Sequence, residues 1–422
     1  MRQSQLFTKT SKTAPKDEKA VNAKLLIRAG FVRKMSAGIY AYLPLGWRVI
    51  QKIANIVREE MNAIGGEELL MPTLVAKEYW EKSKRWDNDV VYKTEESSAI
   101  GHQSSYGLGW THEEVITYLA THFINSYKDL PAVRHGLPLA VYQIQNKFRN
   151  EPRAKNGLLR GREFLMKDLY SFHIDKADLD QYYEQVTGAY KKVFQRLSLD
   201  TKITEAAGGA FTQEYTHEFQ VLSPAGEDEI FYCAKCDFSQ NKEIFQGKAG
   251  DKCQKCGDNI QQSNAIEVGN VFKLGTRYSE AFDLRVTNKE GKKDLVVMGS
   301  YGIGITRAMA TLVEVYNDDK GIVWPEAVAP FKVHLIALGG KEKSKIEKEA
   351  DKVYNQLEKA GVEVLYDDRD VSAGEKLGDA DLLGMPYRAV ISEKTGDKIE
   401  LKRRNKDGVQ SVSVTELLKL LK

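Results

Sequence analysis

One strongly patterned stretch, residues 148–168, constrains the fold most: its letters FRNEPRAKNGLLRGREFLMKD include four arginines and two lysines against three acids. The residues leading into it alternate in character. One face carries Tyr142, Ile144 and Phe148, and the other face carries Gln143, Gln145, Lys147, Arg149 and Glu151. After a loop at Asn156-Gly157, one face of the next segment carries Arg160, Arg162 and Phe164. Such alternation predicts two antiparallel strands, the first with a buried side and a polar side.

The predicted hairpin has the chemistry to hold a nucleoside triphosphate. Arginine binds phosphate oxygens bidentately, each charge-assisted bond being worth roughly 1.5–3 kcal/mol. Phe164 offers a ring that can stack on a base, and Glu151 offers a carboxylate that can accept a hydrogen bond from an exocyclic amine. Composition alone favours a simpler alternative, a basic hairpin that is only solvated.

The same letters resemble motif 2 of class II aminoacyl-tRNA synthetases, FRxE followed by a loop and RxxxF, and REFLMKDLYSFH resembles the bacterial-type prolyl branch. This resemblance implies that Arg149 holds the α-phosphate of ATP and that Glu151 holds the adenine amine. It also implies that Arg160 reaches the outer phosphates and that Phe164 stacks on adenine. The resemblance extends over nearly the whole chain, with one departure described below.

Length and charge describe an ordinary globular protein. The chain has 422 residues, enough for two to three domains, with 42% hydrophobic residues and a net charge of only +3. Nucleic-acid affinity would therefore come from local patches. No apolar run approaches the roughly 18 residues of a membrane span, and the start MRQSQLFTKT has no signal core. We therefore expect a cytoplasmic protein without a membrane partner.

The N-terminal part shows two helical patterns within residues 20–64, followed by a strand ELLMPTL with Pro72 near its end. An amphipathic core helix and an edge strand explain this pattern by themselves. The arrangement also resembles motif 1 of the class, which implies a homodimer.

Residues 111–114, Thr-His-Glu-Glu, open a predicted helix. Thr111 with Glu114 three residues later has the spacing of a capping box. In the prolyl family the matching loop holds the α-amino group of the substrate, which implies that role for Thr111 and Glu113. The two interpretations use different acids, so both can hold.

Apolar and aromatic residues alternate after motif 2. One strand face carries Phe164, Met166, Asp168, Tyr170 and Phe172, a pattern that a buried core explains equally well. The resemblance implies that Met166, Asp168, Tyr170 and Phe172, with Arg149, form the wall of a small pocket for L-proline. It places His173, Glu218 and Ser300 near that pocket.

Four cysteines lie in one short segment as C-A-K-C at 233–236 and C-Q-K-C at 253–256. The spacing C-x2-C-x16-C-x2-C is typical of a zinc ribbon with a structural Zn²⁺ held by Cys233, Cys236, Cys253 and Cys256. Such an ion would stabilise a segment that we expect to be too short and polar to form its own core. Many bacterial-type relatives carry an editing domain here, and its replacement implies that Ala-tRNA(Pro) is not cleared in cis.

Glycines at 299, 302 and 304 precede a helical pattern in which Arg307 lies off the apolar face. Their GxxGxG spacing is not that of a Rossmann loop. A surface arginine is the simpler interpretation of Arg307. The string resembles motif 3, however, which implies that Arg307 grips the γ-phosphate. Glu267 is a candidate contact for Mg²⁺ or the ribose.

The remaining residues alternate between strands and helices after a proline-bounded linker, which predicts a separate α/β domain with a mixed sheet. This domain resembles the anticodon-binding domain shared by the prolyl, threonyl, histidyl and glycyl enzymes. We expect no C-terminal extension after it, which argues against the archaeal and eukaryotic type. We predict an α/β (α+β) protein whose catalytic domain is built on an antiparallel sheet. We expect three parts in the chain. They are a catalytic domain over residues 1–324, which includes the insertion 228–265, a linker over 325–330 and an anticodon-binding domain over 331–422.

The predicted activity is proline--tRNA ligation: ATP and L-proline form prolyl-adenylate, and the prolyl group passes to tRNA(Pro). Arg149, Arg160 and Arg307, with Mg²⁺, would supply positioning and charge neutralisation. One alternative is a threonyl enzyme, which needs a catalytic zinc with an open ligand position. The other is a non-catalytic paralogue, in which phosphate-binding residues are commonly lost.

Overall fold

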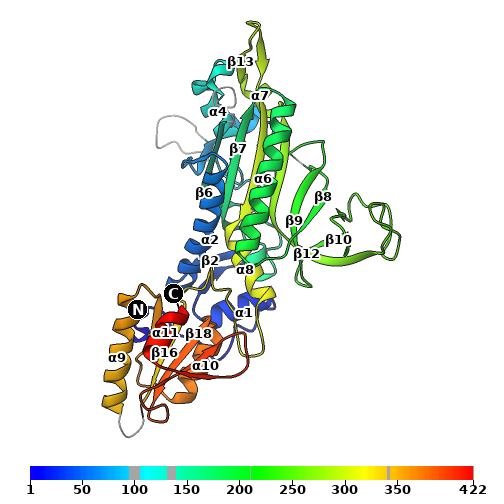
Figure 1. The fold of residues 1–422 in the computed structure, drawn as a ribbon. Coiled ribbons are helices and arrows are strands. Elements are labelled where there is room, and N and C mark those ends of the chain that lie inside the picture. Colours follow the sequence, from blue (N-terminus) through cyan, green and yellow to red (C-terminus); the bar gives the residue numbers. More distant parts are fainter. Residues whose placement is uncertain (95–104, 131–138, 210, 340–342, 422) are drawn as a thin grey trace. The chain divides into compact units, whose positions relative to one another are not determined.

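The computed structural model describes residues 1–94, 105–130, 139–209, 211–339 and 343–421 (Figure 1). The chain divides into two compact units. The larger unit comprises Ser36–Ile39 and Ile53–Thr311, and the smaller unit comprises Met1–Met35, Tyr40–Lys52 and Leu312–Lys422. None of the helices in the described ranges is both long and apolar enough to cross a membrane.

A nine-stranded sheet, counted within the described residues, is the framework of the larger unit. Its order is β10-β11-β8-β9-β12-β15-β7-β6-β3, and the pairings from β8 through β6 are antiparallel. The strands are β3 (Gly66–Glu68), β6 (Leu139–Phe148), β7 (Glu163–His173), β8 (Lys202–Ala206), β9 (Thr216–Leu222), β10 (Asp228–Cys233), β11 (Ser239–Asn241), β12 (Ile260–Gly275) and β15 (Val297–Gly304). The predicted antiparallel catalytic sheet is confirmed.

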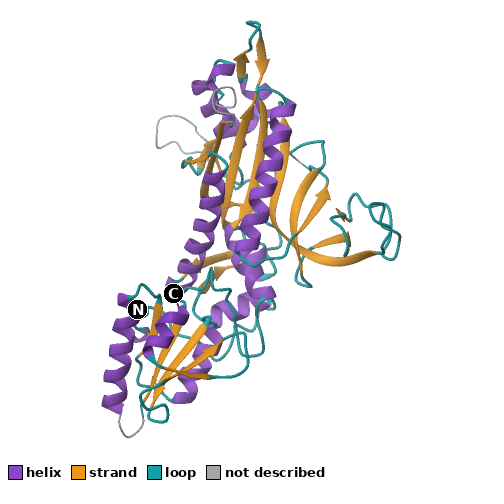
Figure 2. Ribbon diagram, viewed as in Figure 1, coloured by secondary structure: helices purple, strands orange, loops and turns teal. Residues whose placement is uncertain are grey.

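Helix α6 (Lys176–Arg196) lies against β7, β12 and β15 (Figure 2). The Asp175 side chain accepts a hydrogen bond from the backbone N–H of Asp178 and so caps the first turn of α6. The buried residues of α6 recur at helical spacing, namely Leu179, Tyr182, Tyr183, Val186, Tyr190 and Val193. This helix covers one face of the sheet, which leaves the opposite side chains of β7 available for the cavity described below.

Shorter elements, divided between the two units, make up the rest of the chain before residue 333. They are η1 (Gln3–Gln5), α1 (Val21–Arg28), β1 (Val32–Ser36), β2 (Ile39–Tyr42), α2 (Pro44–Ala63), β4 (Leu74–Ala76), α3 (Lys77–Lys82), β5 (Tyr106–Leu108), α4 (Glu113–Phe123), η2 (Tyr127–Asp129), η3 (Gly157–Leu159), α7 (Arg277–Phe282), β13 (Arg285–Thr287), β14 (Lys293–Leu295) and α8 (Ile305–Val315). The two helices expected within 20–64 are α1 and α2, with the hairpin β1–β2 between them.

The strand predicted for ELLMPTL is wrong as one element. The chain leaves the sheet after β3 and forms β4 three residues past Met71. The N–H of Leu69 still bonds to the carbonyl of Tyr142, but that of Met71 bonds to the side chain of Gln143. Pro72 then has no N–H to continue a ladder.

Side chains of β6 alternate between the two faces of the sheet, but which of them are buried differs from the prediction. Gln143 and Lys147, expected on a polar side, are fully buried, whereas Ile144 is only half-buried. Tertiary partners explain this outcome, because both polar side chains bond to Asp168 on β7. Arg160 and Arg162, expected within the second strand, precede β7.

The smaller unit contains a five-stranded sheet, within the described residues, of order β17-β16-β18-β19-β20. Its elements are β16 (Val333–Leu338), α9 (Lys343–Lys359), β17 (Val364–Asp367), α10 (Ala373–Leu383), β18 (Tyr387–Ser392), β19 (Ile399–Arg403), β20 (Gln410–Val412) and α11 (Val414–Leu421). Strand β16 pairs parallel with β17 and β18, and β18 pairs antiparallel with β19. The predicted mixed sheet is confirmed, with β20 as an additional strand.

Candidate active site

Two cavities in the larger unit share three lining residues, Arg149, Glu267 and Arg307. The first, of about 240 Å³, is otherwise lined by Glu151, Leu159, Arg160, Ala225, Gly226, Glu227, Asp228, Ala265 and Ile266. The second, of about 280 Å³, is lined by polar and apolar side chains that include Thr111, Glu113, Phe164, Met166, Asp168, Tyr170, Phe211, Phe272 and Ser300. We call them the phosphate cavity and the amino-acid cavity.

Arg149 and Arg307 reach these cavities from distant parts of the chain. Arg149 directly follows β6, and Arg307 is in the first turn of α8, after β15. Arg307 donates from Nε to the carbonyl of Leu159 at 2.9 Å and from Nη1 to that of Glu267 at 2.8 Å. The helix therefore fixes one guanidinium and the end of β6 supplies the other.

The Arg149 guanidinium is not bonded directly to any acid among the described residues, although Glu267 and Glu151 lie near it. It lies over the Phe164 ring at 5.1 Å, and within the described residues its Nε has no hydrogen-bond partner and it forms no ion pair. Burial and the neighbouring Arg307 lower the pKa of Arg149 to about 10. A cation kept near another cation at an open cavity is suited to bind an anion.

Arg160, in contrast, is fully engaged by acids. Its Nε donates to Glu151 Oε2 at 2.9 Å and its Nη1 donates to Glu227 Oε2 at 2.7 Å. Hydrogen bonds to Glu227 and Glu151 raise the pKa of Arg160. Asn156, in the left-handed conformation (φ 60°), donates to Glu227 Oε1 at 3.0 Å. No local pattern points to Glu227, because it lies in a loop far from residues 148–168 in the chain and resembles any surface acid.

The β7 residues Phe164, Met166, Asp168 and Tyr170 line the amino-acid cavity together. Phe172 continues the same face but is buried in the core cluster of this unit, and it does not line the cavity. The β-strand alternation thus places four of the five expected side chains at the cavity.

Thr111 and Glu113 line the same cavity, and a third group holds both. Arg85 donates from Nη2 to Thr111 Oγ1 at 2.8 Å and from Nη1 to Glu113 Oε2 at 3.1 Å. Ser300 donates to Glu113 Oε1 at 3.0 Å. The predicted capping box is wrong: α4 starts after His112 without a side-chain cap, and the Glu114 carboxylate accepts from Ser83 and Arg85 instead.

A buried polar network supports the floor of the cavity. Lys147 Nζ lies 2.8 Å from Asp168 Oδ1 and 2.8 Å from His112 Nδ1. The Tyr170 hydroxyl donates to Asp168 Oδ2 at 2.9 Å and accepts from the backbone N–H of His112 at 2.8 Å. Burial and Lys147 lower the pKa of His112 to about 4. Burial alone would raise the pKa of Asp168, but Lys147 and His112 hold it below its usual range.

Two expected site residues lie elsewhere. His173 points to the α6 side of the sheet, with Nε2 2.7 Å from Ser171 Oγ and Nδ1 3.1 Å from Asp178. Glu218, on β9, accepts from Gln220 at 2.8 Å. Burial and Glu267 raise the pKa of Glu218 to about 8. Neither residue lines the two cavities.

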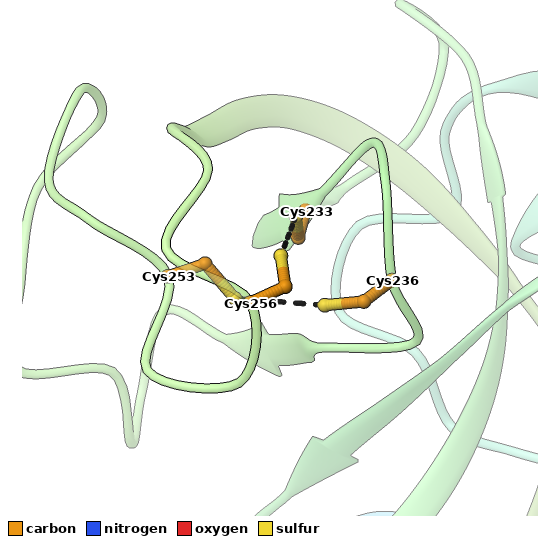
Figure 3. Close-up of side chains that lie close together, drawn as sticks. All are labelled: Cys233, Cys236, Cys253 and Cys256. Carbon is orange, nitrogen blue, oxygen red and sulfur yellow. Dashed lines mark hydrogen bonds between the residues drawn. The ribbon is translucent and has the colours of Figure 1, made fainter.

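The four cysteines converge next to β10 (Figure 3). Their Sγ atoms all lie within 4.8 Å of one another, so the cluster could hold a metal ion. The expectation that the segment has no core of its own is wrong. Phe231 and Phe245 stack at 4.4 Å, and Phe238 and Ile260 pack beside them and Cys233.

Two regions of the chain match known families. Residues 92–316 match the tRNA synthetase class II core domain (G, H, P, S and T), and residues 332–422 match the anticodon binding domain. The antiparallel sheet and the arginine-lined cavities agree with that assignment. The fold and the site thus define a class II aminoacyl-tRNA synthetase.

Full-length relatives narrow the assignment. The chain is 40% identical to the proline--tRNA ligase of Rhizorhabdus wittichii over 96% of either chain. It is 39% identical to that of Zymomonas mobilis over 100% of this chain and 98% of the relative. The chain belongs to the proline--tRNA ligase family.

Other members are longer. The Brachyspira hyodysenteriae proline--tRNA ligase is 32% identical over an alignment of 576 positions that covers 100% of this chain and 98% of the relative. Because this chain has 422 residues, that relative carries segments without a counterpart here.

Solved structures share the fold. The Giardia lamblia prolyl-tRNA synthetase in complex with prolyl-adenylate has a TM-score of 0.76 and 20% identity, over 93% of this chain and 74% of that chain. The Cryptosporidium parvum prolyl-tRNA synthetase complexed with halofuginone and AMPPNP has a TM-score of 0.76 and 18% identity, over 95% and 76%.

Proposed function

We propose that the chain activates L-proline with ATP to prolyl-adenylate and transfers the prolyl group to the 3′ end of tRNA(Pro). The observation that carries this proposal is the presence of Arg149 and Arg307 in the lining of both cavities. A triphosphate in the phosphate cavity and an amino acid in the neighbouring cavity would meet at these two guanidinium groups.

The reaction needs no covalent nucleophile. The proline carboxylate attacks the α-phosphorus and pyrophosphate leaves, so the protein contributes positioning and charge neutralisation. Arg149 would bind the α-phosphate and Arg307 the γ-phosphate. Arg160 would reach the outer phosphates by exchanging its bond with Glu227 for a bond to a phosphate oxygen. Mg²⁺ that accompanies ATP would supply further charge neutralisation, with Glu267 as a candidate ligand.

The nucleotide base and the amino acid would occupy opposite ends. Phe164 would stack on adenine, and Glu151 would accept a hydrogen bond from its amine. Thr111 and Glu113 would bind the secondary ammonium of proline. The apolar wall for its ring would come from cavity-lining side chains, namely Met166, Tyr170, Phe211 and Phe272, with Asp168 and Ser300 beside them.

We propose that the cysteine cluster holds a structural Zn²⁺. Four thiolates satisfy the tetrahedral preference of zinc and leave no open position for a substrate. The cluster is therefore unsuited to the catalytic role that zinc would need in a threonyl enzyme.

We also propose that this enzyme does not edit in cis. A proline cavity rejects alanine by only about 1–3 kcal/mol per missing methylene, so mischarging will occur. The short insertion 228–265 leaves fewer than thirty residues between Asn241 and Glu267. Purified protein should hydrolyse Ala-tRNA(Pro) no faster than buffer, and a clear excess over the buffer rate would refute this point.

We further propose that the protein is cytoplasmic and forms a homodimer. Its proposed domain boundaries are 1–324, 325–330 and 331–422. Recognition of tRNA(Pro) by residues 331–422 would involve unpaired anticodon bases. Leu70 and Leu74, in the motif 1 region, are 75% and 54% exposed and could be covered by a second copy. Sedimentation of the purified protein as a monomer at micromolar concentration would refute the dimer.

Amino-acid-dependent ATP–pyrophosphate exchange, screened across the twenty amino acids, tests the activity. The proposal predicts exchange with proline and much weaker exchange with alanine. Exchange driven by threonine would indicate the threonyl alternative. Absence of exchange with all amino acids would indicate a non-catalytic paralogue.

A further inference from the structure

Arg85 is a buried cation behind the amino-acid cavity that sequence patterns did not single out. It follows α3 in the chain, and its side chain is 4% exposed. Its guanidinium donates to Thr111 Oγ1, Glu113 Oε2 and Glu114 Oε1 at 2.8, 3.1 and 2.9 Å. One side chain therefore fixes both groups that we assign to the amine of the substrate.

Aromatic rings lock this guanidinium in place. The Arg85 Cζ atom lies 4.1 Å from the ring centroid of Trp110 and 5.3 Å from that of Phe211. Trp80 and Tyr278 follow at 5.8 Å each. A planar guanidinium suits such stacking and the fork of three acceptors, whereas a lysine ammonium would satisfy only part of it.

Arg85 also balances two adjacent buried acids. Glu113 and Glu114 are 1% and 0% exposed, and no other cationic side chain is ion-paired with either of them within the described residues. Glu114 points away from the cavity toward Ser83, whereas Glu113 lines the cavity. Without Arg85, two neighbouring carboxylates would share a buried site with no compensating cation, and their mutual repulsion would displace Glu113 from its present position.

We propose that Arg85 is a positioning residue for amine recognition: through its hydrogen bonds it holds Glu113 and Thr111 so that both side chains face the ring nitrogen of proline. It acts through these two residues and is not part of the cavity lining. This inference rests on the proposed function. It adds a specific expectation, because loss of Arg85 should weaken proline binding while leaving the nucleotide end of the site intact.

The test measures pyrophosphate exchange for Arg85→Met, Arg85→Lys and the double variant Arg85→Met/Glu114→Gln. Arg85→Met should raise KM for proline by about 10- to 100-fold, the effect expected from losing a charge-assisted contact, with KM for ATP unchanged. Arg85→Lys should recover part of the loss. The double variant should show a lower KM for proline than Arg85→Met, because the repelling charge of Glu114 is gone.

A matched control is Arg58→Met, which removes an arginine that forks onto Glu68 at 2.6 and 2.9 Å on the surface of the same unit. It should leave both KM values unchanged. A proline analogue without the amine, tetrahydrofuran-2-carboxylate, should inhibit wild type and Arg85→Met equally. That result separates loss of amine recognition from collapse of the whole cavity.

Specific outcomes overturn the inference. An unchanged KM for proline, or a parallel rise in KM for proline and ATP, would show that Arg85 has no role in amine recognition or only a general structural one. If Arg85→Met does not fold, Arg85→Lys decides by the same criterion. Failure of the wild-type protein to exchange with proline would refute the proposed function itself, which is a distinct result.

Discussion

Replacing Arg149 with methionine should slow adenylate formation by orders of magnitude and, at the same time, make the unliganded protein more stable. Arg149 lies in the site near a second cation, and its Nε has no hydrogen-bond partner within the described residues. Keeping such a charge in the folded protein lowers its stability, but it leaves the guanidinium available to bind an anion. Methionine has a similar length, fills the space and carries no charge.

The magnitudes follow from the surroundings of Arg149. Its pKa falls from the ordinary 12.5 to about 10. At about 1.4 kcal/mol per pKa unit this is about 3 kcal/mol, which partial solvent exposure of the side chain reduces to about 1–2 kcal/mol. The lost cation–π contact with Phe164 offsets less than about 1 kcal/mol of this gain. The net gain should raise Tm by a few degrees, at about 2–4 °C per kcal/mol.

The activity should change in the opposite direction. Two charge-assisted hydrogen bonds to the α-phosphate are worth about 3–6 kcal/mol together, so kcat/KM for ATP should fall by about 10²- to 10⁴-fold. Proline-dependent pyrophosphate exchange and thermal denaturation of the same preparation measure both effects. Arg153→Met, at an exposed position between β6 and β7, is the control and should change neither quantity. Exchange within tenfold of wild type, or a clear fall in Tm, would refute the assignment of Arg149.

Three further predictions concern an ion pair, two histidines and the cysteine cluster. Lys147→Met should lower the free energy of unfolding by about 3–5 kcal/mol in urea titrations, because Asp168 loses its ion-pair partner inside the protein. Adding Asp168→Asn should recover part of that loss, and no recovery would contradict the pairing. Stability should fall as pH drops from about 6.5 to about 4, because the pKa values of buried His112 and His334 are lowered to about 4 in the folded state. The unfolded chain takes up protons in this window and the folded chain does not, so the stability present above pH 6.5 is lost, by about 3 kcal/mol per histidine at most. His112→Gln should flatten this part of the profile. Finally, elemental analysis should find one zinc ion per chain, and its removal by a chelator should make residues 228–265 sensitive to protease. Cys233→Ser should likewise lack zinc and be sensitive to protease in this segment. Zinc-free protein with unchanged protease resistance would refute the site.

Patterns that depend on neighbouring residues were predictable from the sequence. The alternation of β7 placed Phe164, Met166, Asp168 and Tyr170 on one face, and the structure gives that face to the amino-acid cavity. The strand and helix order of the C-terminal domain was equally readable, because each element carries its own periodicity. The cysteine spacing likewise anticipated that the four thiols converge.

Pairings between distant residues were not predictable. Gln143 and Lys147 are polar but buried. Asp168 on the neighbouring strand accepts a hydrogen bond from Gln143 and forms an ion pair with Lys147, which offsets the cost of removing both side chains from water. Thr111 and Glu114 have the spacing of a capping box, but both side chains instead accept hydrogen bonds from Arg85, which lies earlier in the chain. Glu227 engages Arg160 from a loop without any pattern. Local rules fail at these positions because buried charges select their partners in three dimensions.

The most direct measurement is a crystal structure of the protein with a non-hydrolysable prolyl-adenylate analogue. The phosphate of the analogue should lie between Arg149 and Arg307, with adenine on Phe164 and the ring nitrogen within hydrogen-bond distance of Thr111 and Glu113. An analogue bound elsewhere, or a phosphate that contacts neither arginine, would contradict the proposed convergence of two distant arginines on one substrate.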